Sequence, residues 1–436
     1  MSKKESFQTI AGTKDILPEE QPLWQFVLES ASRVASSYNF DRIDTPILEF
    51  SSVFKKGTGE TTDIVQKEMF SFSTKGGDDV TLRPEGTPPV IRAYLNHGME
   101  KLITPVKLFY MGAMFRYEKP QQGRRRQLHQ FGVECIGEEY PIRDAQVIQI
   151  FFSLFQALGI HDVIVEVNTL GCSLCLSAYK KKLKSYYESH VTQLCADCRA
   201  RYKTNLLRLL DCKDEKCHRM KQASPQILDF LCEDCNTHFQ TVLNFLDILS
   251  IPYFLNPHLV RGLDYYTRTV FEIFQGQVAE DMSYDVNKRL ALASGGRYDQ
   301  LVEVMGGKKS TPAVGGAMGI ERVIECIDEK VKKQHVVQPP DVFIVQLGEK
   351  AKERSLFLIE EFRREGVRVG EAFGRDSMTA QLKIADRLGV ALVLIIGQQE
   401  VIDDNVIIRE MKTGSQDVVS SSQLMDEVRK RLPIRE

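Results

Sequence analysis

Two strand-like runs joined by a basic loop constrain the fold of this chain most. Residues 107–118 and 127–136 are predicted to form β-strands. The connection between them, residues 119–126, is polar, contains proline and glycine, and ends in three consecutive arginines. Such punctuation is typical of a loop. The sequence therefore predicts a hairpin with a long basic tip.

The second strand of this hairpin carries two polar side chains on one face. Successive side chains of a strand point to opposite faces. Gln130 and Glu134 therefore point the same way, whereas His129, Phe131 and Val133 point the other way. Exposure to solvent is the commoner outcome for an isolated pair of this kind, and a binding pocket is the alternative.

Further helices and strands are expected on both sides of the hairpin. Pro46 suits a strand end or edge because proline cannot donate to a sheet ladder. Residues 293–299 contain two glycines and are expected to form a turn that a ligand can approach closely. The other elements expected are a helix over 19–38, strands over 40–48 and 80–87, a helix over 143–158, a strand over 161–169, and a strand that passes into a helix over 313–332.

A linker and a change of pattern separate the last part of the chain. Residues 338–340 read Gln-Pro-Pro. Beyond them, strands alternate with helices, which predicts a separate α/β domain. The strands are expected at 341–347, 367–369, 391–396 and 405–410, and the helices at 349–365, 377–388 and 422–431. We therefore expect a first domain over residues 1–335 and a second over 336–436. The glycine-rich phosphate loop of P-loop proteins is absent from the sequence.

Residues 171–250 differ in composition and contain eight of the ten cysteines. Their helical periodicity predicts a helical insertion within the first domain. The cysteines form four pairs whose spacing is typical of zinc knuckles, with packing as small apolar residues as the alternative. The pairs are Cys172 and Cys175, Cys195 and Cys198, Cys212 and Cys217, and Cys232 and Cys235.

Composition excludes some classes of protein. The chain has 436 residues, enough for about two or three domains, and its 43% apolar and 27% charged residues are ordinary for a soluble globular protein. A net charge of −2 means that any contact with nucleic acid depends on local basic patches. No apolar run approaches the ~20 residues of a membrane span, and the start has no apolar signal core. A cytoplasmic protein is expected.

Residues 259–269 concentrate more chemically useful side chains than any other stretch. Arg261 can bind an anion, and Gly262 allows a close backbone approach. Tyr265 and Tyr266 each present a ring with a polar tip, and an apolar run with strand character follows. Taken alone, the stretch is typical of a strand with two amphipathic tyrosines on its rim.

Four strings in the chain resemble signatures of the histidine–tRNA ligases, which are class II aminoacyl-tRNA synthetases. They are LRPEGT at residues 82–87, HQFGVE at 129–134, RGLDYY at 261–266 and GGRYD at 295–299. Segments 19–48, 115–126 and 313–322 are similar to class II motifs 1, 2 and 3. The resemblance runs from residue 10 to the carboxyl end. It implies an α+β class II catalytic domain, an antiparallel sheet flanked by helices with a helical insertion, followed by an α/β anticodon-binding domain.

The resemblance also implies roles for individual residues. Arg116 and Arg261 would be catalytic, stabilising charge at the α-phosphate of ATP, and Arg116 and Arg322 would bind ATP. Arginine suits this task because its planar fork meets phosphate oxygens and stays charged. Mg²⁺ would bridge the β- and γ-phosphates, without a dedicated set of protein metal ligands. Histidine would be bound by Glu85, Gly86, Thr87, Gln130, Glu134, Tyr265, Tyr266 and Tyr298. The acceptor stem of the tRNA would be contacted by Gln121, Arg124 and Arg126.

The implied reaction joins histidine to its tRNA through a histidyl-adenylate and releases AMP and pyrophosphate. A homodimer assembled through motif 1 is expected, and zinc in the insertion is not required by the family. One alternative is a histidine-binding regulatory paralogue, which would lack RGLDYY and the terminal domain. The other is a class II synthetase for another amino acid, which would lack Glu134 and the pair Tyr265 and Tyr266.

Overall fold

The computed structural model describes residues 7–118, 124–212, 214–276 and 291–432. The chain divides into two compact units, Met1–Val336 and Val337–Glu436. Within the described ranges, no helix is both long enough and apolar enough to cross a membrane.

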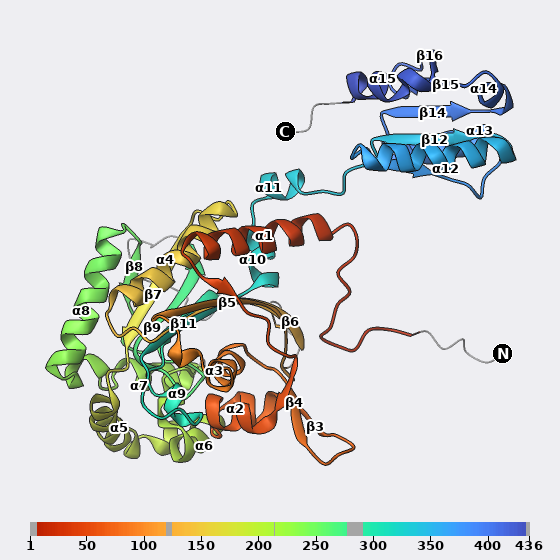
Figure 1. Ribbon diagram of the computed structural model, residues 1–436. Coiled ribbons are helices and arrows are strands. Elements are labelled where there is room, and N and C mark those ends of the chain that lie inside the picture. Colours follow the sequence, from red (N-terminus) through yellow and green to blue (C-terminus); the bar gives the residue numbers. More distant parts are fainter. Residues whose placement is uncertain (1–6, 119–123, 213, 277–290, 433–436) are drawn as a thin grey trace. The chain divides into compact units, whose positions relative to one another are not determined.

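An eight-stranded sheet forms the centre of the first unit (Figure 1). Neighbouring strands are antiparallel except for the outer pairs β1–β5 and β7–β8, which are parallel. The predicted hairpin is present as β5 and β6, paired from Phe115 opposite Gln127 to Val106 opposite Ile136. In order across the sheet, the strands are β1 (Asp41–Arg42), β5 (Val106–Phe115), β6 (Gln127–Ile136), β11 (Ala313–Gly319), β10 (Ala291–Arg297), β9 (Thr267–Gln275), β7 (Val163–Thr169) and β8 (Tyr253–Leu255).

The two faces of β6 have different surroundings. Phe131 and Val133 lie in a core with α1 (Gln21–Ser37), α4 (Ile142–Ala157) and α10 (Ile320–Cys326), which Figure 1 shows on the same side of the sheet. Gln130 and Glu134 point to the opposite face, as strand alternation predicted. That face packs beneath α3 (Thr87–Asn96) and the insertion. One face is thus a closed core, and the other supports the candidate site.

The predicted strand over residues 40–48 is wrong, because the segment is divided between two sheets. β1 pairs with β5 in the large sheet. β2 (Leu48–Phe50) pairs with β4 (Asp79–Leu82), which also pairs with β3 (Phe70–Ser73) in a separate three-stranded sheet. Pro46 lies between β1 and β2, where its missing N–H interrupts no ladder. α2 (Ser51–Thr58) follows β2 directly.

Two other predicted elements differ from the structure. The glycines of residues 293–299 lie in strand β10 and not in a turn; they allow close packing of strands, because a Cβ at Gly295 would overlap the carbonyl oxygen of Gly315. The helix expected to reach residue 332 ends at Cys326. A new helix, α11 (Glu329–Gln334), begins after Asp328, whose side chain caps it by accepting from the N–H of Lys330 at 2.7 Å.

The insertion is helical, as predicted, but it has no core of its own. Many of its buried side chains, including Tyr179 and Leu209, belong to the same apolar cluster as Tyr265 and Tyr266, and Leu246 belongs to the main core. Its last helix also packs against α4 of the main core. Its helices are α5 (Ser173–Glu188), α6 (Ala196–Thr204), α7 (Glu215–Gln222) and α8 (Glu233–Ile248), with 3₁₀ turns η3 (Val191–Gln193), η4 (Leu206–Leu209) and η5 (Ile227–Phe230).

The second unit is a five-stranded sheet with helices, ordered β13-β12-β14-β15-β16. β12 pairs in parallel with both β13 and β14. The pairs β14–β15 and β15–β16 are antiparallel. Two elements were not predicted: β16, an edge strand in which only Val419 is buried, and the short α14. The elements are β12 (Val342–Gln346), α12 (Glu349–Arg364), β13 (Val369–Glu371), α13 (Met378–Leu388), β14 (Leu392–Ile396), α14 (Gln398–Ile402), β15 (Asn405–Glu410), β16 (Gln416–Ser420) and α15 (Leu424–Arg431).

Candidate active site

The turn between β4 and α3 presents a buried carboxyl group. Glu85 accepts hydrogen bonds from the hydroxyls of Thr58, at 2.5 Å, and Tyr265, at 2.8 Å. Burial raises the pKa of Glu85. The next residue has to be glycine, because a Cβ at Gly86 would overlap the ring of Tyr110. The substrate-amine string and the RGLDYY string, far apart in sequence, are therefore joined at one carboxylate.

A second buried carboxyl group lies on β6. Glu134 is fully buried and accepts from the hydroxyl of Thr87 at 2.6 Å and from the hydroxyl of Tyr298. Burial raises its pKa to about 8, and the two hydroxyl donors lower it by less. Gly315 in the neighbouring strand leaves the space that this side chain needs, because a Cβ there would overlap the carboxylate.

A cavity of about 220 Å³ lies beside these carboxyl groups. Glu85 and Thr87 line one part of it, and the side-chain oxygen of Gln130 is buried there without a hydrogen-bond partner among the described residues. Glu134 and Tyr298 are not among the described residues that line the cavity; they lie behind Thr87. The predicted site residues that line it are Glu85, Thr87, Arg116, Arg124, Gln130, Arg261, Tyr265, Tyr266 and Arg322.

Arginines line the rest of the cavity: we call Arg116, Arg124, Arg125, Arg261 and Arg322 its arginine end, and Glu85, Thr87 and Gln130 its carboxyl end. Arg261 donates to Glu272 and, at 2.7 Å, to Ser294, and its guanidinium lies over the ring of Tyr266 at 5.9 Å. Arg116 donates to the carbonyl oxygen of Pro84 at 2.9 Å. These contacts hold each guanidinium by its edge, so that the cation lines the cavity while its orientation is fixed.

Arginines outnumber carboxyl groups among the described residues that line the cavity, five against four. Arg322 donates to the carbonyl oxygen of Ala291 at 3.0 Å. Burial lowers the pKa of Arg322, and the nearby charges of Arg116 and Arg124 lower it further, while the carboxylates of Glu118 and Glu321 act in the opposite direction. Like charges held this close favour an anionic ligand, because its binding removes their repulsion.

The loop arginines are not equivalent. Arg124 pairs with Glu118 at 3.2 Å and lines the cavity together with Arg125. Arg126 turns away: its backbone N–H donates to the carbonyl of Gly12 at 2.8 Å, and its guanidinium lies 4.0 Å from the centre of the Tyr117 ring. Gln121, the third residue expected on the acceptor stem, lies outside the described residues.

Sequence reasoning missed the residues that support the site. Glu272 and Ser294 both contact Arg261 and face each other across the pairing of β9 with β10. Glu272 had a detectable signal, because it is the charged residue within the apolar run of residues 270–274. Tyr110 had none: its position between Gly86 and Gly132 depends on contacts that only the fold creates.

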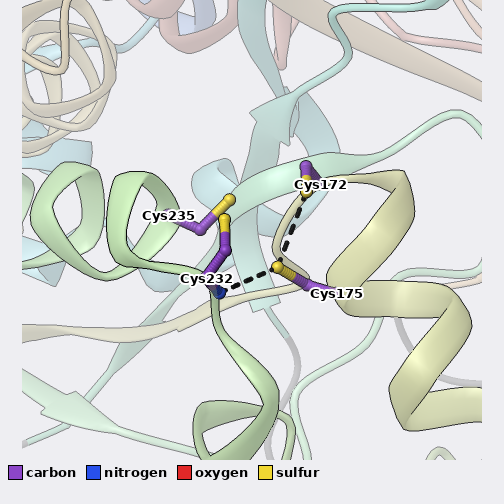
Figure 2. Close-up of side chains that lie close together, drawn as sticks. All are labelled: Cys172, Cys175, Cys232 and Cys235. Atoms are coloured by element: carbon purple, nitrogen blue, oxygen red, sulfur yellow. Dashed lines mark hydrogen bonds between the residues drawn. The ribbon is translucent and has the colours of Figure 1, made fainter.

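The eight cysteines of the insertion form two groups, and none of the eight is among the described residues that line the cavity. We call Cys172, Cys175, Cys232 and Cys235 the first cysteine set, and Cys195, Cys198, Cys212 and Cys217 the second cysteine set. Within each set, all sulfur atoms lie within 4.8 Å of one another. Figure 2 shows the first set, with the four side chains directed towards a common point. Each set is a candidate metal site with no part in the cavity.

The fold and the cavity define a class of protein. An antiparallel sheet carries dispersed arginines that suit a polyphosphate, buried carboxyls that suit an amino acid lie beside them, and an α/β unit follows. This combination is that of a class II aminoacyl-tRNA synthetase.

Comparison with known proteins identifies the family within this class. Residues 12–323 match the model of the family described as histidyl-tRNA synthetase, and residues 341–431 match the anticodon binding domain. A histidine–tRNA ligase of Dehalococcoides mccartyi is 43% identical, covering 98% of this chain and 100% of the relative. One from Halothermothrix orenii is 44% identical, covering 96% and 98%. The chain therefore belongs to the histidyl-tRNA synthetase family.

A solved structure agrees in fold. The apo histidyl-tRNA synthetase of S. aureus is 32% identical, with a TM-score of 0.79, covering 97% of this chain and all of that one. The predicted α+β architecture, with a class II catalytic domain and an α/β anticodon-binding domain, is confirmed.

Proposed function

We propose that this chain ligates histidine to its tRNA, using ATP to form a histidyl-adenylate and releasing AMP and pyrophosphate. One observation carries the proposal: a single cavity is lined both by the hydrogen-bonded carboxyl group of Glu85 and by five arginines. An amino acid has a cationic ammonium group and ATP has an anionic triphosphate. In the proposed complex both bind at this cavity, with the histidine carboxylate facing the α-phosphate.

The carboxyl end is proposed to bind histidine. Glu85 and the unpartnered oxygen of Gln130 are acceptors for the α-ammonium, and Thr87 can accept as well because its own proton is donated to Glu134. Tyr266 presents a phenol to one ring nitrogen of the substrate. Glu134 and Tyr298 orient the pocket from behind Thr87. Rivals without two ring nitrogens would leave buried polar groups unpaired, which penalises them.

The arginine end is proposed to bind ATP and to catalyse the first step. The histidine carboxylate attacks the α-phosphate in line, and pyrophosphate leaves. Arg116 and Arg261 are placed to stabilise the negative charge that develops at that phosphate, and Arg322 with Arg124 to hold the γ-phosphate. Because the substrate carboxylate is the nucleophile, the step needs no side-chain nucleophile.

Mg²⁺ fits the arginine end of the cavity. It is a hard cation that prefers oxygen ligands and is usually held by one or two carboxylates together with substrate phosphates. Glu118 and Glu272 are carboxylates that line this end. Bound there, Mg²⁺ would neutralise charge on the β- and γ-phosphates. Since the cysteine sets contribute nothing to the cavity, a metal held by them would serve structure and not this step.

The tRNA is proposed to be contacted by both units. Arg126, whose guanidinium lies over the ring of Tyr117, and Gln121 are the candidates for the acceptor stem, and the second unit is the candidate for the anticodon. A domain boundary near residues 335–337 is part of this proposal. Deletion of the second unit should leave adenylate formation intact while tRNA charging falls sharply. A folded truncated protein that makes no adenylate would contradict this division.

A homodimer is proposed as the working form. Leu48 and Phe50 of β2 and Phe72 of β3 belong to one three-stranded sheet, Ile47 directly precedes β2, and all four side chains are more than 40% exposed. Apolar side chains gathered in this way favour burial against another surface. Light scattering of the purified protein should give twice the chain mass of 49.6 kDa. A monomer at micromolar concentration would contradict this part of the proposal.

Pyrophosphate exchange with each amino acid in turn tests the activity. ATP should re-form from labelled pyrophosphate only when histidine is present, and tRNA with the histidine anticodon should then be charged. Exchange with another amino acid would favour a different synthetase. Histidine binding without exchange would favour a regulatory paralogue, which the match of both family models disfavours.

A further inference from the structure

We propose that the insertion binds two structural zinc ions, one in each cysteine set. The ion in the second set would fix the segment that carries Asn205 and Arg208, which contacts residues 262–264 of RGLDYY. The sequence left the assignment of pairs to sites open. The structure combines the first pair with the last and encloses the two middle pairs between them. A zinc site can be closed in this arrangement by two separate chain segments.

The spacing of the sulfur atoms fits one tetrahedral ion. Zinc binds thiolate sulfur at ~2.3 Å, which places the corners of a regular tetrahedron ~3.8 Å apart. The sulfurs of Cys172 and Cys175 are 3.5 Å apart, and those of Cys195 and Cys212 are 3.8 Å apart. A disulfide needs ~2.05 Å, and all ten cysteines are free. An iron–sulfur cluster inserts several irons and sulfides between its cysteines, so it needs wider spacing.

The backbone around each set favours thiolates. Cys172, Cys195 and Cys232 each lie at the residue that precedes a helix, where the helix dipole favours negative charge. Backbone N–H groups also point at sulfur: that of Cys232 lies 3.1 Å from the sulfur of Cys175, and that of Cys195 lies 3.4 Å from the sulfur of Cys217. Figure 2 shows the first of these contacts. Such outer contacts are usual around metal-bound cysteines, and packing alone does not require them.

The first cysteine set joins the two ends of the insertion. Cys172 and Cys175 lie at the start of α5, directly after β7, and Cys232 and Cys235 at the start of α8, which packs against α4. A zinc ion there would close the insertion at its base and attach it to the main core.

The second cysteine set lies next to a segment that touches the catalytic part. Arg208 donates to Asp63 at 2.8 Å, and Asn205 donates to Asp264 at 2.8 Å. Arg208 also lies against Gly262 of RGLDYY, where a Cβ would be 2.7 Å from the guanidinium. Both residues lie between the two cysteine pairs of the second set, and Cys195, Arg208 and Arg261 line one common pocket. Arg208 is therefore a positioning residue, and the ion would hold the segment that carries it.

Metal analysis of the full-length protein, purified without chelator, tests the sites. We expect two zinc per chain, and X-ray absorption at the zinc edge should show four sulfur neighbours at ~2.3 Å. Protein without metal and with ten titratable thiols would overturn the proposal, and so would disulfides within the sets or iron in place of zinc. This measurement does not depend on whether any variant folds.

Paired variants test the coupling to the active site. The double substitution Cys195→Ser and Cys198→Ser should lose one zinc, and backbone amide hydrogen exchange should quicken at residues 58–64 and 262–264. Cys172→Ser with Cys175→Ser should lose the other zinc without that local change, and Cys326→Ser, outside both sets, should lose none. Zinc loss from the second set with unchanged exchange at those residues would overturn the coupling. Because metal content and exchange are read without substrate, failure here is distinguishable from failure of the proposed activity.

Discussion

The two ends of the cavity achieve their charge balance in opposite ways. At the carboxyl end, Glu85 and Glu134 each accept two hydroxyl hydrogen bonds, and neither forms an ion pair within the described residues. At the arginine end, Arg322 has a lowered pKa partly because other arginines lie near it. At the first end the two carboxyl groups are satisfied before substrate arrives, although the oxygen of Gln130 has no partner among the described residues, whereas at the second end arginines outnumber carboxyl groups until an anion enters.

This difference predicts different functions for the two ends: one selects the substrate, and the other stabilises the transition state. A prearranged, hydrogen-bonded pocket selects its ligand by shape and by the pattern of donors and acceptors. Clustered cations held by Glu272, Ser294 and backbone carbonyls instead stabilise charge as it develops in the transition state. Substitutions at the arginine end should therefore affect the rate of activation, and substitutions at the carboxyl end should affect the use of histidine.

The largest effect is expected from Arg261→Ala. Loss of one preorganised donor should slow adenylate formation by about 10²–10³, or ~2.7–4 kcal/mol, with little change in histidine affinity. Stopped-flow measurement of the first turnover checks it. Ser294→Ala is the matched control, since it removes one support of Arg261 but keeps the guanidinium, and should cost only a few-fold. A near-wild-type rate in Arg261→Ala would remove the distinction between the two ends.

Glu134→Gln should lower kcat/KM for histidine by about tenfold, or ~1.4 kcal/mol, while the KM for ATP stays nearly constant. A glutamine accepts through one atom only, so Thr87 or Tyr298 must turn its hydroxyl round. If Thr87 turns, it loses a lone pair for the substrate ammonium. Tyr298→Phe removes the partner on the other oxygen and should have a smaller effect. Loss of ATP binding in Glu134→Gln would show that this face of β6 belongs to the ATP site and not to the histidine pocket.

The same substitution should change how stability depends on pH. The folded pKa of Glu134 is raised to about 8, so the folded protein keeps a proton that the unfolded chain releases above about pH 4.5. Stability from this group is therefore lost as pH rises from about 4.5 to 8, by at most ~1.4 kcal/mol per pH unit. Urea unfolding of the first unit between pH 5 and 9 should show a flatter dependence in Glu134→Gln. Equal slopes in the two proteins would contradict a buried, protonated Glu134.

The sequence predicted local relations in this site well and distant ones poorly. Alternation along one strand placed Gln130 and Glu134 on a common face, because that relation depends only on backbone geometry. The support of Arg261 depends on Ser294 lying opposite Glu272 in two paired strands. The combination of the four cysteine pairs into two sets also depends on tertiary contacts. Spacing along the sequence does not distinguish one combination of pairs from another. Register and tertiary contacts decide these relations, and one sequence does not contain them in readable form.

The fold followed the same rule. The hairpin and the alternating elements of the second unit matched because long apolar patterns determine them. The two short strands around Pro46 were read as one because a two-residue and a three-residue strand have no period of their own. Strand β16 was missed because an exposed edge strand buries almost nothing.

The smallest effect separates two neighbours in the basic loop. Arg124 lines the arginine end, so Arg124→Ala should raise the KM for ATP about threefold in pyrophosphate exchange without tRNA, or ~0.7 kcal/mol. Arg126 lies on Tyr117 and outside the cavity lining, so Arg126→Ala should leave that exchange within a factor of two. It should instead weaken tRNA charging and lower its salt dependence, since a lost phosphate contact releases fewer counterions. Equal effects of both substitutions on exchange would show that Arg126 contributes to ATP binding as Arg124 does. Equal effects on charging alone would assign both residues to the tRNA, and the arginine end would then keep Arg116, Arg125, Arg261 and Arg322 among the described residues.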